Sequence, residues 1–150
     1  MRLKSIPLGI LIFFILFGGI AFTSAMNWWQ TESSKIPARY TEGEAAGQYN
    51  PADIRGSYTF GDINKNFGIP LTDLQAAFRL PAGGDVSTIK VNSLETLYEG
   101  LTVEMGTGAV RLFTAFYLGL PYDLASNEET FLFPEAAAVL KTNGKMTADQ

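Results

Sequence analysis

The chain has 150 residues and contains neither cysteine nor histidine. It therefore lacks the side chains of most zinc, haem and iron–sulfur sites, and it has no cysteine nucleophile, Ser-His-Asp relay or disulfide. The formal net charge is −4, and an acidic surface does not attract phosphate backbones, so we expect no nucleic-acid partner. We predict a protein that is not an enzyme and that binds no cofactor.

The chain opens with an apolar stretch. No charged residue occurs between Lys4 and Glu32. The run Ile6–Met26 supplies about the ~20 residues that a helix needs to cross a bilayer. The sequence therefore predicts a single transmembrane helix that contacts membrane lipid, with its positive end in the cytoplasm.

Two tryptophans, Trp28 and Trp29, follow this run, at the depth where aromatic rings prefer to lie in a membrane. We assign residues 1–29 to an anchor, or to an uncleaved signal. A cleaved signal peptide is the alternative, because Thr23–Ala25 offers small residues near a possible cleavage point. Both readings place the rest of the chain on the extracytoplasmic side of the cytoplasmic membrane.

Residues 30–49 are polar and lack a sustained helical or strand period, so we predict a tether. Its Tyr40 and Tyr49 are candidates for contacts with a partner, because tyrosine is enriched at protein interfaces. Asn50 then begins a turn signal, and we place the folded domain at residues 50–150. Arg55 is a charged residue in apolar surroundings, and it is either paired with a nearby aspartate or available to a ligand.

The stretch Thr59–Leu80 has the spacing of two short helices joined by a tight turn. Gly68 lies at the turn, where a positive φ is required, and Pro70 suits the start of the second helix. The residues that such a pair would bury are Ile63, Phe67, Ile69, Leu74, and Ala77 or Phe78. The pattern of a capped helix start occurs twice, at Thr59 with Asp62 and at Thr72 with Gln75.

A second region repeats this plan after about 38 residues, since Ala115–Pro121 resembles Ala77–Pro81. Two such pairs could cover each other's apolar faces, although chance similarity is the alternative. A last helix begins at Pro134 and is expected to stop at Gly144 in the left-handed conformation. The predicted fold class is all-α: an N-terminal transmembrane helix, then a small helical bundle of two helix-turn-helix-like pairs plus a C-terminal helix.

No motif in the chain specifies a reaction. The acidic pairs Glu42 with Glu44 and Glu128 with Glu129 lack the spacing of a calcium loop, so we interpret them as solvated surface. The stretch Thr59–Leu80 resembles the helix-turn-helix superfamily of DNA-binding domains. Its second helix lacks the cluster of Lys and Arg that phosphate contacts require, so the DNA-binding function is not expected.

A longer resemblance covers most of the chain after Trp28. It rests on NWWQTESSKIP, YNPADIRGSYTFGDINKNFGIPLTDL, GAVRLFTAFYLGLPY and LKTNGKMT. These segments resemble an uncharacterised envelope domain that is found behind a single membrane helix or appended to membrane-bound four-iron ferredoxin-type proteins. The resemblance implies an accessory role beside membrane electron-transfer machinery, and any iron–sulfur cluster would belong to a partner.

Our first hypothesis is a non-catalytic, membrane-anchored accessory or interaction module with a membrane protein as its partner. The alternative is an envelope domain that binds a small ligand or peptide between its helix pairs. A hydrolase or a DNA-binding regulator are the remaining readings. The candidate interaction residues are Trp28, Trp29, Tyr40, Tyr49, Arg55 and Tyr122.

Overall fold

The regular structure of the chain is helical. The computed structural model describes residues 5–25, 34–103, 105–124 and 130–146; within the first range it describes the side chains at 7–20 and 22. In these residues the only other regular elements are two isolated β-bridges. The chain divides into two units, Met1–Ser34 and Lys35–Gln150. The predicted all-α class is confirmed.

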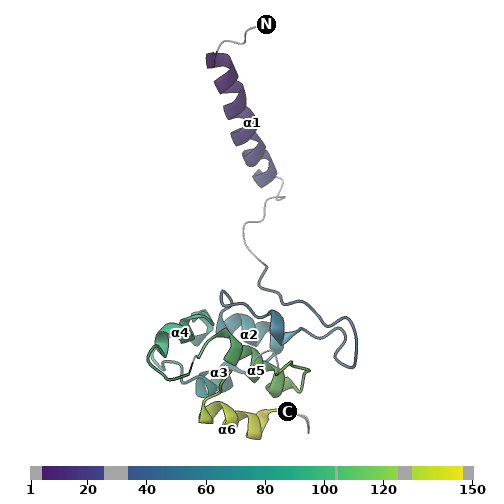
Figure 1. The fold of residues 1–150 in the computed structure, drawn as a ribbon, viewed down its shortest axis with the longest axis vertical. Helices are drawn as coiled ribbons and strands as arrows, with labels where there is room; N and C mark the ends of the chain where they lie inside the picture. The colour runs from purple at the N-terminus through teal and green to yellow at the C-terminus, as the bar shows by residue number, and fades with distance from the viewer. Residues whose placement is uncertain (1–4, 26–33, 104, 125–129, 147–150) are drawn as a thin grey trace. The chain divides into compact units, whose positions relative to one another are not determined.

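Helix α1, Ser5–Ala25, belongs to the first unit (Figure 1). Its described side chains, those of residues 7–20 and 22, are exposed. In the part of the chain that the structure describes, no helix combines the length and the apolarity that crossing a membrane requires.

This finding corrects two predictions. The prediction of a transmembrane helix at Ile6–Met26 is wrong, because no described helix has the required length and apolarity. The single-pass location in the cytoplasmic membrane, which was derived from that helix, is wrong for the same reason. The predicted contact between this helix and membrane lipid loses its basis.

Helices α2, Phe60–Phe67, and α3, Leu71–Ala77, form a packed pair in the second unit. The backbone N–H of Asp62 donates to the Thr59 hydroxyl at 3.1 Å, and the Thr59 N–H donates to the Asp62 carboxylate at 2.8 Å. Gly68 ends α2 in the left-handed region, with φ of 70°. The predicted cap and turn are therefore confirmed.

Two other predicted details of helix ends are wrong. Thr72 lies inside α3, whose N-cap is Pro70, so it does not cap that helix. Helix α6, Pro134–Asn143, stops at Gly144 with φ of −76°, not in the left-handed region. A Cβ on Gly144 would lie 2.4 Å from the Leu140 carbonyl oxygen, so glycine is required there for a close approach of the backbone.

The second region forms helices but no second pair. Helix α4, Ser93–Leu97, has five residues, little more than one turn, whereas α5, Thr107–Leu118, has twelve. Among the described elements, α5 packs on α6 and on the 3₁₀ turn η1, Pro51–Asp53, while α4 and α5 do not pack closely. The predicted second helix-turn-helix-like pair is therefore wrong, because one turn offers too little apolar surface to match α5.

The core lies between α2, α3, α5 and α6, with a second 3₁₀ turn, η2, Val86–Thr88, packed on α2 and α3. Figure 1 shows α6 running alongside α3 and α5 at one end of this group. The Phe78 ring lies between those of Phe60 and Phe113, with centroid distances of 5.7 and 5.3 Å. All three side chains are fully buried. Of the residues predicted to be buried, those found in the core are Ile63, Phe67, Ile69, Leu74, Ala77 and Phe78.

Candidate functional site

Residues 38–50 form a short antiparallel hairpin ahead of the helices. Arg39 and Tyr49 make an isolated bridge. The Tyr40 N–H donates to the Gln48 carbonyl at 2.9 Å, and the Asn50 N–H donates to the Ala38 carbonyl at 2.8 Å. We call residues 38–50 the hairpin. The sequence predicts a tether over residues 30–49, whereas residues 35–49 belong to the second unit.

Several contacts fix the hairpin on the helices. The Tyr40 hydroxyl donates to the Pro121 carbonyl at 2.6 Å, just after the end of α5. Ala45 is buried, and the Tyr49 ring lies edge-on against Phe67 with 6.2 Å between centroids. The Ala38 N–H donates to the Asp53 carboxylate at 2.8 Å. The hairpin is therefore held at its base and on both of its sides.

The end of α5 has a backbone conformation that brings residues 118–121 beneath the hairpin. Gly119 takes φ of 66°, and the Leu120 N–H donates to the Ala115 carbonyl at 2.9 Å. This is the arrangement that commonly closes a helix with a left-handed glycine. A Cβ at Gly119 would lie 2.3 Å from the Lys145 carbonyl oxygen, so a larger residue is excluded by contact as well as by φ.

Two adjoining cavities separate the hairpin from the end of α5. The first has a volume of about 320 Å³ and is lined by Glu44, Ala45, Gln48, Leu118, Gly119, Leu120 and Pro121. The second has about 350 Å³ and is lined by Arg39, Gly47, Gln48, Tyr49, Asn66, Phe67, Leu118 and Leu120. Because three residues line both, we treat the cavities as one depression, the hairpin groove. The volume of each cavity lies at the lower end of the range typical of ligand sites, ~300–1,000 Å³.

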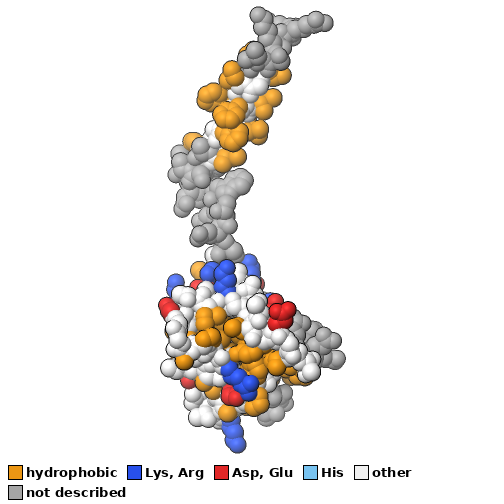
Figure 2. Space-filling model, turned by 90° about the vertical axis from the view of Figure 1, so that its left-hand side faces the viewer, with side chains coloured by type: hydrophobic (Ala, Val, Ile, Leu, Met, Phe, Trp, Pro, Cys, Tyr) orange, Lys and Arg blue, Asp and Glu red, His pale blue; other side chains and the backbone are white. Residues whose placement is uncertain are grey.

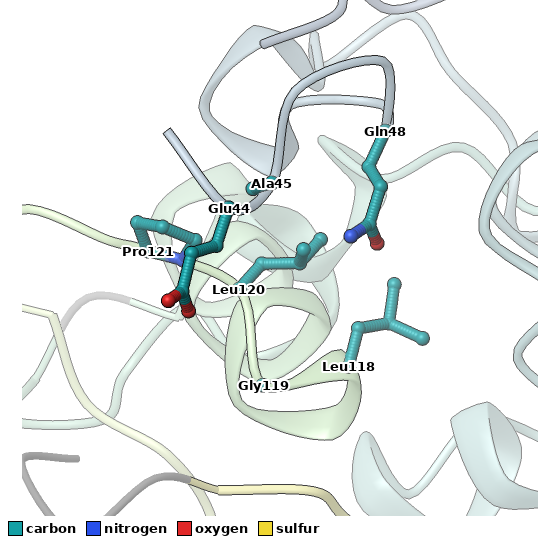
Figure 3. Close-up of a pocket in the computed structure, with 7 residues that line it drawn as sticks. All are labelled: Glu44, Ala45, Gln48, Leu118, Gly119, Leu120 and Pro121. Atoms are coloured by element: carbon teal, nitrogen blue, oxygen red, sulfur yellow. The ribbon is translucent and has the colours of Figure 1, made fainter. Parts of the chain in front are cut away.

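Figure 3 shows the side chains of the first cavity. The Glu44 carboxylate and the Gln48 amide lie on opposite sides, with Leu120 between them and Leu118 nearby. Ala45 and Leu120 are buried, whereas Glu44, Gln48 and Pro121 are exposed. The floor is therefore apolar and the rim is polar.

Arg39 lies at the second cavity in a defined position. Its guanidinium carbon is 3.9 Å from the centroid of the Tyr49 ring, and its Nη1 donates to the Gly47 carbonyl. A cation over an aromatic face is attracted by the ring quadrupole. Among the residues that the structure describes, ion pairs join Lys35 to Asp62, Arg55 to Asp53 and Arg79 to Glu135, and none includes Arg39 or Glu44.

The candidate interaction residues are distributed unevenly around this site. Tyr49 lines the groove and Tyr40 holds the hairpin beside it. Arg55 is exposed and lies 3.4 Å from the Asp53 carboxylate, as the pairing alternative predicts. Trp28 and Trp29 lie outside the described residues.

Tyr122 follows the groove but is half-buried against the core. Its buried hydroxyl has no hydrogen-bond partner in the described part of the protein. Burial raises the pKa of Tyr122; the charge of Arg111 opposes this change and that of Asp123 adds to it.

The sequence did not indicate most of the other groove residues, and it assigned Glu44 to solvated surface. The residues that it did not indicate are Arg39, Ala45, Gly47, Gln48, Asn66 and Leu118–Pro121. The signal for the α5 end was present in the glycine and proline of the LGLP segment. The hairpin had no such signal, because its polar residues resemble an ordinary linker.

The described residues contain no group of three or more Asp or Glu side chains placed to hold a metal ion.

The second unit also exposes apolar side chains, and Figure 2 shows such side chains on one of its faces. Among the described residues of this unit, the exposed large apolar side chains are Ile36, Leu97, Leu101, Leu124, Phe131 and Met146. They do not line the groove, and nothing in the structure shows what covers them.

Comparison of the chain with known protein families, with curated proteins and with solved structures finds no match. The function is therefore argued from the site.

Proposed function

We propose that the chain is a non-catalytic interaction module that holds a segment of a partner protein in the hairpin groove. The observation that carries this proposal is the pair of adjoining cavities between the hairpin and the end of α5. An apolar floor with a polar rim is the usual anatomy of a protein interface. Tyr49 contributes a large ring held by packing, which is a favourable interface residue because little conformational entropy is lost on binding.

The resemblance to an envelope domain that accompanies ferredoxin-type proteins supports an accessory role beside electron-transfer proteins. The chain has no cysteine with which to hold a cluster, so the redox centre would be the partner's. A small ligand in the same groove is the second candidate, favoured by cavity volumes of about 320 and 350 Å³.

The test uses the tagged full chain, expressed in its native host and purified with chemical cross-linking. Gln48→Trp places a large side chain in both cavities from an exposed position, so the core is left intact. Ala138→Trp is the control, since Ala138 is an exposed residue of α6 that lines neither cavity.

We expect one partner at fixed stoichiometry with the wild type and with Ala138→Trp, and its loss with Gln48→Trp. Retention of the partner by Gln48→Trp would overturn the proposal. Native mass spectrometry of the same samples tests the second candidate: a small molecule retained by a chain without a protein partner would replace the first proposal.

A further inference from the structure

The two ends of the hairpin groove carry opposite charges. Glu44 lines only the first cavity and Arg39 lines only the second. The residues that line both cavities, Gln48, Leu118 and Leu120, separate them. A segment that fills both cavities would therefore meet an anion at one end and a cation at the other.

Arg39 and Glu44 can each still bind a group of the opposite charge. Arg39 uses one donor on the Gly47 carbonyl and stacks on Tyr49, whereas a guanidinium carries five N–H donors in a planar fork suited to carboxylates. Glu44 makes no ion pair in the described part of the protein, where the three pairs involve other residues. Stacking fixes Arg39 before binding, so less side-chain entropy is lost when it pairs.

The middle of the groove suits an extended backbone. Leu118 and Leu120 supply apolar surface, and the Gln48 side-chain amide can both donate and accept a hydrogen bond. In an extended chain alternate side chains point to the same face. Such a chain can place an apolar residue on the leucines and leave its flanking charged residues for Arg39 and Glu44.

The net charge of the second unit argues against an occupant whose charged residues are all acidic. Of the 11 basic and 15 acidic residues of the chain, Arg2, Lys4 and Glu32 precede residue 35, which leaves 9 basic and 14 acidic residues, a net −5. A purely acidic peptide would be repelled by this field, and a purely basic one would leave Arg39 opposed by a like charge.

We propose that the partner segment is an extended peptide with an acidic residue that pairs with Arg39, a basic residue that pairs with Glu44, and an apolar residue between them. This inference rests on the proposed function and specifies the chemistry of the partner. Arg39 and Glu44 would distinguish one partner from another, and Leu118 and Leu120 would supply the remaining, apolar contact.

The probes are four fluorescent synthetic peptides of equal length with a leucine centre. One has an acidic and a basic end, one has the reverse order, one has two acidic ends and one has two basic ends. Binding to the full chain is followed by fluorescence anisotropy at low salt. We expect one of the two mixed peptides to bind more tightly than both single-sign peptides.

Variants of the full chain assign each charge. Arg39→Gln should weaken the preferred mixed peptide roughly two- to five-fold, the size of a partly exposed ion pair, and should remove the advantage of its acidic end. Glu44→Gln should do the same for the basic end. Lys90→Gln and Glu99→Gln are matched controls at exposed positions that line neither cavity, and they should bind like the wild type.

The outcomes separate this inference from the proposed function. If all four peptides bind alike, or if none binds up to about 1 mM, the charge assignment is overturned. Capture of the native partner and its loss in Gln48→Trp would still support the groove. If Gln48→Trp leaves both the native partner and the peptides bound, the groove itself is the wrong site.

Discussion

Gly68 shows how one residue sets the direction of the chain between α2 and α3. Its φ of 70° lies in the left-handed region, and a Cβ built on it would meet no atom within 4 Å. Glycine is therefore required at this position because of its backbone conformation, and not because neighbouring atoms would clash with a side chain. Left-handed backbone costs an ordinary L-residue about 1–2 kcal/mol, and a β-branched side chain is opposed most strongly.

We expect Gly68→Val to lower the free energy of unfolding by about 1–2 kcal/mol or more, measured by urea denaturation. Gly83→Val is the matched control, because Gly83 also has open space around its Cβ position and does not have a positive φ. Equal effects of the two substitutions would show that the backbone conformation at Gly68 is not what stabilises the turn.

Arg79 occupies the same left-handed region with φ of 48°, one residue after Phe78, the C-cap of α3. Its guanidinium lies 4.6 Å from the Phe133 ring centroid and 2.8 Å from the Glu135 carboxylate. The Tyr98 hydroxyl also donates to the Arg79 carbonyl at 3.0 Å. These contacts hold a non-glycine residue where glycine would be the easier choice.

Replacing Arg79 by Ala and by Gly separates the contacts from the backbone strain, since both variants lose the side-chain contacts. We expect Arg79→Gly to be more stable than Arg79→Ala by about 1 kcal/mol, the reverse of their order inside a helix. Thermal and urea unfolding of the two variants measure this difference. A more stable alanine variant would contradict the left-handed assignment.

At the residue scale, the sequence predicted what depends on close neighbours. The Thr59 cap, the Gly68 turn and the buried residues from Ile63 to Phe78 follow from spacing within about twenty positions. Gly144 was predicted for the wrong reason, because its role is to let the backbone approach Leu140. Such crowding depends on the path of the backbone after the helix, which residue type alone does not specify.

At the scale of elements, a polar network joins α3, α5 and α6. The Tyr117 hydroxyl of α5 donates to the Asp73 carboxylate of α3 at 2.7 Å, and the Asn143 amide of α6 donates to the same oxygen at 2.8 Å. Burial, followed by the hydrogen bond to Asp73 and its charge, raises the pKa of Tyr117 to about 12. The protonated phenol is therefore the form that stabilises the fold.

Tyr117→Phe should lower stability at neutral pH by about 1.5–3 kcal/mol, the size of a hydrogen bond to a charged group. The unfolded tyrosine ionises near pH 10 and the folded one near 12. The advantage of the wild type over the variant is thus complete below pH 10 and declines as the pH rises through 12. Urea unfolding of both proteins at several pH values measures it, and an advantage that stays constant from pH 10 to 12 would contradict this role.

The predicted second helix pair shows why a local sequence repeat does not determine how helices pack. The segments that end α3 and α5 resemble each other, yet α4 is one short turn while α2 is a full partner of α3. The resemblance came from residues that end any buried helix. Helix α5 packs instead on η1, which lies far before it in sequence, and on α6, the next helix of the chain. Neither partner belongs to the apparent repeat, so the repeat could not predict the packing of α5.

At the scale of the whole second unit, the residues before position 50 are part of the folded structure. Pro37 and Ala45 are buried, and Tyr49 packs on Phe67. Lys35 pairs with Asp62 at 3.2 Å. The sequence could not predict this, because the Tyr40 contact with Pro121 joins positions 81 residues apart.

A chain that begins at residue 50 should therefore be less stable than one that begins at residue 35. The expected difference is about 2–3 kcal/mol, the sum of small contributions of roughly 0.5–1.5 kcal/mol each. They come from the partly buried Tyr49 ring on Phe67, the buried Ala45 and the hydrogen bond from Tyr40 to Pro121. Circular dichroism during urea unfolding measures both, and both should give helical spectra if they fold. Equal stability of the two chains would mean that the hairpin contributes nothing to the fold.

The hairpin also forms one wall of the groove, so the groove exists only while the hairpin is closed on α5. Any free energy needed to close it is subtracted from the affinity for an occupant, and an occupant shifts the equilibrium toward the closed state. The N–H groups of Tyr40, Gly47 and Asn50 bond across the hairpin at 2.8–2.9 Å. Their rates of amide hydrogen exchange therefore report how often the hairpin opens, and they should slow in proportion to occupancy of the groove.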